Sequence, residues 1–111
     1  MKHNQYDIWL ADLNPRMGTE PGKTRPVVII QTDLLNEIHT STLICPITSD
    51  VVKGIELLRI HLRKGQLDQP SDVLIDQVRA IDNRRFIRRV GRLTKEQIVK
   101  LKENIRIVLD L

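Results

Sequence analysis

Apolar and polar positions alternate along much of this chain with the period of two that is typical of β-strands. In residues 6–13 this alternation sets Ile8 and Leu10 against Trp9, which predicts a strand. Residues 14–24 follow with two prolines and two glycines, a composition that predicts a long loop. The chain therefore opens with a strand and a loop that is long for so small a protein.

The next segments continue the β pattern. Residues 25–31 are apolar and β-branched, which predicts a buried strand with Pro26 at its first position. Thr32 and Asp33 are residues that cap helices, and they predict one short helical turn after this strand. Further strands are predicted over residues 41–48, 56–65, 71–82 and 84–93.

The last segment has the period of a helix. Thr94 with Gln97 three residues later matches a capping box, which predicts where the helix begins. Each fully buried aliphatic side chain contributes roughly 1.5–3 kcal/mol, so we expect the apolar face of this helix to pack against the sheet. That face consists of Ile98, Leu101, Ile105 and Val108.

Several strands followed by one helix predict a mostly β fold of the α+β class. Strands this short favour a small, strongly bent antiparallel sheet, an SH3-like barrel that is partly closed, with the C-terminal helix beside it. The 111 residues predict a single domain spanning residues 1–111. Aromatic residues make up only 3% of the chain, so the core should be aliphatic, and dimerisation would add stability to so small a core.

Charge and cysteine content narrow the function classes. The formal net charge is +4 and the sequence pI is about 9.6, which favours a polyanionic partner but also fits an ordinary basic surface. Cys45 is the only cysteine, so no disulfide forms within the chain, and its apolar neighbours predict a buried thiol. No stretch resembles a signal peptide or a membrane span, so we expect a soluble, cytoplasmic protein.

The basic charge is concentrated near the C-terminal end. Arg84 to Arg92 contains five arginines and no acidic residue. Such a run can track a nucleic-acid backbone, dock an acidic segment of a protein, or form a solvated strand face. The sequence leaves these three interpretations open.

Motifs for metal or phosphate chemistry are absent. The chain has no CxxC, HExxH, phosphate-binding GxxxxGK[ST] or DxD motif. His3, His39 and His61 are scattered, and an isolated histidine is more often structural than a ligand or a base. Metal catalysis and RNA cleavage by a pair of histidines therefore have no support, and no cofactor is expected.

Polar residues at strand ends and in the long loop remain as candidates. Each has an ordinary structural explanation, and their spacing alone does not establish a shared site. These residues are Arg25 and Thr48 at strand ends, Thr19 and Glu20 in the loop, and Asp76 and Gln77 within the predicted strand over residues 71–82.

Four ordered motifs give these residues a context. The segment "DIWLADLNPRMGTEPGKTRPVVIIQ", residues 7–31, contains I-W, D-x-x-P, G-x-E and R-P-V in sequence. "PITS" at Pro46 to Ser49 and "DQVRAID" at Asp76 to Asp82 follow at fitting separations. Together with the C-terminal helix, these motifs resemble the MazF/PemK-type toxins over nearly the whole chain.

The resemblance implies a homodimeric SH3-like barrel that cleaves single-stranded RNA, usually mRNA, at short sequences without a metal, and that a cognate antitoxin inhibits. Arg25 and Thr48 match the family's catalytic arginine and threonine. Thr19 and Glu20 match its G-x-E loop. Some relatives carry an arginine two residues before the D-Q pair, where this chain has Leu74, so an acid at that place is missing here.

The chemistry of these side chains fits RNA cleavage through the ribose 2′-OH. A planar guanidinium such as Arg25 can form paired bonds to phosphate oxygens and stabilise a phosphorane. Thr48 can form a hydrogen bond to a phosphate oxygen or to the 2′-OH. Asp76 is a candidate general base, but recognition of a base edge by Asp76 and Gln77 is equally reasonable.

Two other functions share parts of this pattern. A CcdB-like gyrase poison has the same fold and is likewise inhibited by an antitoxin, but it needs no ribonuclease site. The presence of Arg25 and Thr48 in their motifs argues against this function. A non-catalytic SH3-like RNA-binding module would use aromatic stacking, for which only Tyr6, Trp9 and Phe86 are available. The recognised RNA sequence and the identity of the antitoxin do not follow from this sequence.

Overall fold

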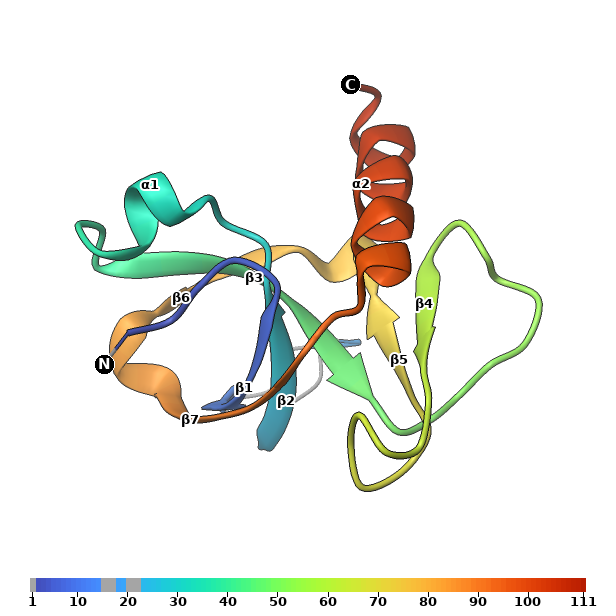
Figure 1. Ribbon diagram of the computed structural model, residues 1–111, viewed down its shortest axis with the longest axis horizontal. Coiled ribbons are helices and arrows are strands. Elements are labelled where there is room, and N and C mark those ends of the chain that lie inside the picture. The colour runs from blue at the N-terminus through green and yellow to red at the C-terminus, as the bar shows by residue number, and fades with distance from the viewer. Residues whose placement is uncertain (1, 15–17, 20–22) are drawn as a thin grey trace.

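The computed structural model describes residues 2–14, 18–19 and 23–111. Within these residues the chain forms a seven-stranded sheet and a C-terminal helix that stands beside it (Figure 1). The strands are β1 (Asp7–Asp12), β2 (Thr24–Ile29), β3 (Ser41–Thr48), β4 (Arg59–Leu62), β5 (Ser71–Leu74), β6 (Arg79–Asp82) and β7 (Phe86–Arg92). The helices are α1 (Asp33–Asn36) and α2 (Lys95–Leu109), with the 3₁₀ turns η1 (Ile75–Gln77) and η2 (Asn83–Arg85).

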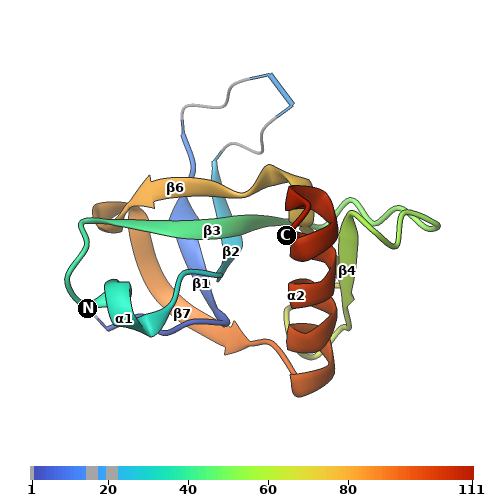
Figure 2. The same ribbon diagram turned by 90° about the horizontal axis from the view of Figure 1, so that it is seen from above.

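All strand pairs are antiparallel. Strand β3 pairs with β2 and β6 and also with β5, so it joins β1, β2, β6 and β7 to β4 and β5. The strand order is β4-β5-β3-β2-β1-β7, and β6 pairs with the first half of β3. Figure 2 shows the strong bend of this sheet, with α2 against one end and α1 at the other. The predicted α+β class is confirmed, but among the described residues hydrogen bonds do not close the barrel, because β4 and β7 end the path.

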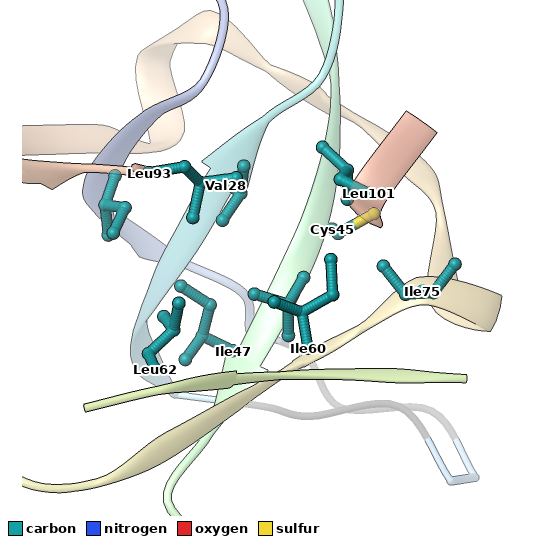
Figure 3. Close-up of a cluster of buried hydrophobic side chains, with 10 residues drawn as sticks. Val28, Cys45, Ile47, Ile60, Leu62, Ile75, Leu93 and Leu101 are labelled. Carbon is teal, nitrogen blue, oxygen red and sulfur yellow. The ribbon is translucent and has the colours of Figure 1, made fainter. Parts of the chain in front are cut away.

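Two apolar clusters hold the fold together. The first lies between the sheet and α2, where Leu101 packs beside Cys45 (Figure 3). The second contains Trp9 and Phe86 among aliphatic side chains. The predicted aliphatic core and the buried free thiol of Cys45 are confirmed.

Helix α2 begins as the sequence predicts. The Thr94 side chain accepts a hydrogen bond from Gln97 N, and the Gln97 side chain accepts one from Thr94 N. These two hydrogen bonds complete the capping box. Ile98 and Ile105 pack partly buried against the first cluster around Leu101. Val108, however, is 37% exposed, so the buried face ends one turn earlier than predicted. No helix in the described part of the chain is long and apolar enough to cross a membrane.

The prediction of one strand over residues 71–82 was wrong. This segment forms β5, η1 and β6 in turn, and Asp76 and Gln77 lie in the 3₁₀ turn η1. Both strands pair with β3, but the register of that pairing shifts by three residues between them. The three residues of η1 take up this shift. The predicted strands over residues 56–65 and 84–93 were likewise too long. The observed strands there are β4, Arg59–Leu62, and β7, Phe86–Arg92.

Candidate functional site

Arg25 and Thr48 come from neighbouring antiparallel strands. In the β2–β3 ladder Val27 is the partner of Pro46. Extending this register by two residues brings Arg25, in β2, to the level of Thr48, the last residue of β3. The β2–β3 pairing itself ends at Val27 and Pro46, and residues that the register sets opposite one another lie on the same face of an antiparallel sheet. The register, extended by two residues, therefore sets Arg25 and Thr48 on the same face of neighbouring strands.

Thr48 ends its strand in a tight turn. The half-buried side chain accepts a hydrogen bond at Oγ1 from Asp50 N at 3.1 Å. A hydroxyl has one proton to donate and a second lone pair, so this turn leaves both available to a substrate. The local sequence thus fixes the side chain while its hydrogen-bonding capacity toward a ligand remains.

A cavity of about 870 Å³ is lined by residues of β1, β2, β3 and β7 and of the segment between β4 and β5. Its lining includes Ile47 and Ser49 but omits Thr48, because successive strand residues point to opposite faces. Arg25 also lines this cavity, together with Thr24 and Pro26. The cavity therefore contains Arg25 but not Thr48, so a substrate that contacts both residues must extend beyond it.

The loop after β1 meets the 3₁₀ turn η1. Gln77 Nε2 donates to Thr19 O at 3.5 Å, and the buried Gln77 Oε1 has no hydrogen-bond partner among the described residues. Asp76 is exposed, and its charge acts on Cys45, whose side chain lies on the opposite face of β3 from Thr48. Glu20 lies outside the described residues. The structure thus joins Thr19 to Gln77, whereas exposed Asp76 forms no hydrogen bond with the described residues.

Most arginines of the run from Arg84 to Arg92 have structural partners. Arg84 pairs with Asp82 at 3.0 Å, and this pairing holds the pKa of the Asp82 carboxyl down at about 2. Arg89 and Arg92 both contact the buried carboxylate of Asp7, each at 3.2 Å. Arg89 and Arg92 therefore tie β7 to Asp7 of β1, whereas Arg84 of η2 forms a local, exposed ion pair.

Arg88 differs from its neighbours. Arg85 donates to the main-chain oxygens of Asp12 and Asn14, whereas exposed Arg88 makes no polar contact with the described residues. Arg88 lines the large cavity together with Lys64. Some arginines of this run therefore have partners within the fold, whereas Arg88 is exposed to solvent at the cavity.

Sequence reasoning missed a buried carboxylate, that of Asp72. Asp72 is the partner of Thr48 in the β3–β5 ladder, and its exposed fraction is 0%. His61 Nδ1 lies 2.5 Å from Asp72 Oδ1, and Arg59 Nη1 lies 3.1 Å from Oδ2. His61, which stands alone in the sequence, is thus part of a polar cluster. The only signal was that Arg59 and His61 share one face of a predicted strand.

The other two histidines have structural contacts. His3 is buried, and its Nε2 lies 2.9 Å from Thr42 Oγ1. His39 Nδ1 accepts a hydrogen bond from Ser41 N. In the part of the chain that the structure describes, no three His, Cys, Asp or Glu side chains gather as they would around a metal ion.

Comparisons with known proteins identify the family of this chain. Residues 4–109 match the model of the PemK-like, MazF-like toxins of type II toxin–antitoxin systems. Endoribonuclease MazF of Staphylococcus epidermidis is 33% identical over 107 residues, which are 95% of this chain and 89% of that protein. The solved structure of a MazF toxin from Mycobacterium tuberculosis superposes with a TM-score of 0.80 at 27% identity, over 95% of this chain and 97% of that one.

A further solved structure shares the fold at lower identity. It is an endoribonuclease from a mycobacterial species in complex with its cognate antitoxin, 13% identical, with a TM-score of 0.81 over 99% of this chain and 97% of that one. The family match covers almost the entire chain. The chain therefore belongs to the PemK/MazF-like toxin family of type II toxin–antitoxin systems.

Proposed function

We propose that residues 1–111 form one toxin domain, an endoribonuclease that cleaves single-stranded RNA at short sequences without a metal ion. The observation that carries this proposal is the register of β2 and β3, which aligns Arg25 with Thr48 when it is extended two residues beyond Val27 and Pro46. Both residues occupy the family's motif positions. A relative that is 33% identical carries the name endoribonuclease, which supports the same activity here.

The reaction needs few groups. The ribose 2′-oxygen attacks the adjacent phosphorus and loses its proton, and the bond from phosphorus to the 5′-oxygen breaks as that oxygen gains a proton. The products are a 2′,3′-cyclic phosphate and a 5′-hydroxyl end. Arg25 stabilises the charge that accumulates on the phosphorane oxygens, and its planar guanidinium suits two of them at once. The Thr48 hydroxyl orients the phosphate or the 2′-OH.

Recognition of the RNA bases falls to the loop after β1 and to η1. Single-stranded RNA presents its base edges for hydrogen bonding. The unpaired Oε1 of Gln77 and its long contact to Thr19 leave that amide free to re-pair with a base edge. We assign Thr19, Glu20, Asp76 and Gln77 to RNA binding and Arg25 and Thr48 to catalysis.

The partners follow from the same assignment. We propose a homodimer that acts in the cytoplasm and is inhibited by a cognate antitoxin protein, with no cofactor and no membrane association. A solved relative with this fold is bound to its cognate antitoxin, which supports this partner. The basic charge of the chain suits an acidic antitoxin segment as well as RNA.

Cleavage in excess EDTA, followed by sequencing of the new 5′ ends, tests the proposal. We expect cuts at a short common sequence with 5′-hydroxyl ends. A substrate with a 2′-deoxy sugar at the cut site should stay intact at that position. RNA binding without cleavage would instead indicate a non-catalytic RNA-binding module, and inhibition of gyrase by a protein that leaves RNA intact would indicate a CcdB-like poison.

A further inference from the structure

A polar cluster around a buried carboxylate lies directly beside the proposed catalytic threonine. Asp72 is the Cα partner of Thr48, and nothing of its surface is exposed. An unpaired buried carboxylate is strongly destabilising, so its retention here requires several donors. Asp72 Oδ2 accepts from Val52 N at 3.1 Å and from Arg59 Nη1 at 3.1 Å. His61 Nδ1 contacts Oδ1 at 2.5 Å.

These contacts reach across the turn that follows Thr48. Arg59 Nη1 also donates to Asp50 O at 2.7 Å, and Asp50 N donates to Thr48 Oγ1 at 3.1 Å. The segment from Thr48 to Val52 is therefore held at its middle by Arg59 and at its end by Asp72. Val52 N and Asp50 O are main-chain groups, so this clamp fixes the path of the backbone itself.

The clamp extends toward helix α2. His61 Nε2 lies 3.7 Å from Glu56 Oε1, and Glu56 pairs with Lys100 of α2 at 2.6 Å. Asn104 of α2 donates to the main-chain oxygen of Glu56 at 2.9 Å. The polar cluster thus ties the loop between β3 and β4 to the helix on one side and to Asp72 on the other.

Electrostatics favours the charged form of this carboxyl. Burial alone would raise the pKa of Asp72, but the hydrogen bonds from Val52, Arg59 and His61 outweigh it, and its pKa lies below the ordinary value. Asp72 is therefore a carboxylate at neutral pH. A charged acceptor forms stronger hydrogen bonds than a neutral one, which suits a group that holds other residues in place.

We propose that Asp72 and Arg59 are positioning residues that hold the Thr48 turn in its catalytic geometry. This inference rests on the proposed function, because it assigns Thr48 to the reaction. Neither residue touches the reacting atoms; both act through the backbone of residues 48–52. A displacement of about 1 Å in a catalytic group can cost on the order of a hundredfold in rate, so loss of the clamp should reduce catalysis more than RNA binding.

The test uses full-length variants of Arg59. Arg59→Met removes the charge and both hydrogen bonds that Nη1 donates, to Asp50 O and Asp72 Oδ2. Arg59→Lys keeps a charged nitrogen that can donate more than one hydrogen bond, but on a shorter side chain. The matched control is Arg63→Met, because exposed Arg63 lies in the same stretch and its side chain makes no polar contact with the described residues. Asp72→Asn weakens the same contacts from the other side, because it removes the charge of the acceptor but keeps the shape of the buried side chain.

Single-turnover cleavage at saturating RNA separates catalysis from binding. We expect Arg59→Met to lower the maximal rate about ten- to a hundredfold, with an RNA Kd within about threefold of that of Arg63→Met, and Arg59→Lys to recover part of the rate. In a Thr48→Ala background the same Arg59→Met change should have little further effect, because it acts through Thr48. An equal loss in both backgrounds, or a wild-type rate for folded Arg59→Met, would overturn the proposal.

Hydrogen exchange gives a readout that does not depend on cleavage. The amide proton of Val52 should exchange at least about tenfold faster in Arg59→Met and Asp72→Asn than in Arg63→Met. Unchanged Val52 exchange would overturn the clamp even if the cleavage rate fell. If the wild-type protein does not cleave RNA at all, the proposed function fails together with the catalytic part of this inference, while Val52 exchange still decides whether the clamp exists.

Discussion

Thr48 and Asp72 are direct partners across the β3–β5 ladder, one half-buried at the proposed reaction site and the other a fully buried carboxylate. Opposite residues of an antiparallel pair share a face of the sheet. Strand β2 lies along the other edge of β3, and the β2–β3 register, extended by two residues, aligns Arg25 with Thr48. A row of polar side chains thus crosses β2, β3 and β5, and this row is the framework for the predictions on catalysis.

Thr48→Ala should slow cleavage while Thr48→Ser retains much of the activity, because the hydroxyl and not the methyl group interacts with RNA. Removal of one preorganised donor typically costs about 10²–10³ in rate. Single-turnover cleavage of a mapped RNA substrate measures the effect, and a thermal melt of each variant checks that it is folded. Equal rates for folded Thr48→Ala and the wild-type protein would remove this residue from catalysis.

Arg25→Ala should lower the cleavage rate by about 10²–10³, since it removes a charged group that stabilises the phosphorane. Arg25→Lys should recover little, because a point charge does not reproduce the paired geometry of a guanidinium. The same single-turnover assay applies, with toxicity on expression as a second readout. A wild-type cleavage rate for Arg25→Lys would mean that charge alone is needed. A wild-type rate and toxicity for Arg25→Ala would exclude Arg25 from the site.

The sequence predicts best where one local rule decides the structure. The predicted strand over residues 41–48 agrees with β3 at both ends, because apolar and β-branched residues fill it. The capping box of Thr94 and Gln97 places the start of α2 correctly, since both hydrogen bonds are local. The short turn capped by Thr32 is confirmed for the same reason. Arg25 and Thr48 could be proposed because each lies in a short motif of the family.

The features that were missed depend on contacts between distant segments. Nothing near Ile75 indicates that β5 and β6 pair with β3 in different registers, so the turn at Asp76 and Gln77 was predicted as a strand. Likewise, Asp72 lies eleven positions from His61 along the chain, and only the β4–β5 ladder brings them together. Alternation predicts which residues share a face of one strand, but it does not predict the partner strand.

Arg88→Gln should weaken RNA binding and reduce its dependence on salt. Arg88 lines the basic cavity and makes no polar contact with the described residues, so its charge is available to a phosphate. Loss of one phosphate contact reduces the slope of log K against log salt by roughly 0.7 for single-stranded RNA. Arg84→Gln is the matched control, because Arg84 is paired with Asp82. Equal slopes for the two variants would leave Arg88 as a solvated residue.

Acid should destabilise the protein partly through Asp72. Its pKa is lower in the folded chain than the ordinary value of 3.8, so the folded state favours the carboxylate. The stability that this provides is present above about pH 4 and is lost as the pH falls through the folded value. Melting temperatures between pH 6 and pH 2.5 should therefore fall less steeply in Asp72→Asn than in the wild-type protein. Asp68→Asn, an exposed control, should follow the wild-type curve.

Cys45 should resist thiol reagents as long as the protein is folded. Burial raises the pKa of its thiol to about 12, with a smaller contribution from the charge of Asp76, so the reactive thiolate is scarce at pH 8. Its side chain also packs against Leu101 of α2 and has no exposed surface (Figure 3). Labelling with a disulfide reagent at pH 8 should therefore be slow in buffer and become fast over the urea range in which the far-ultraviolet circular dichroism is lost. Rapid labelling of the fully folded protein would mean that α2 separates from the sheet without global unfolding, and Leu101→Ala should then accelerate it further.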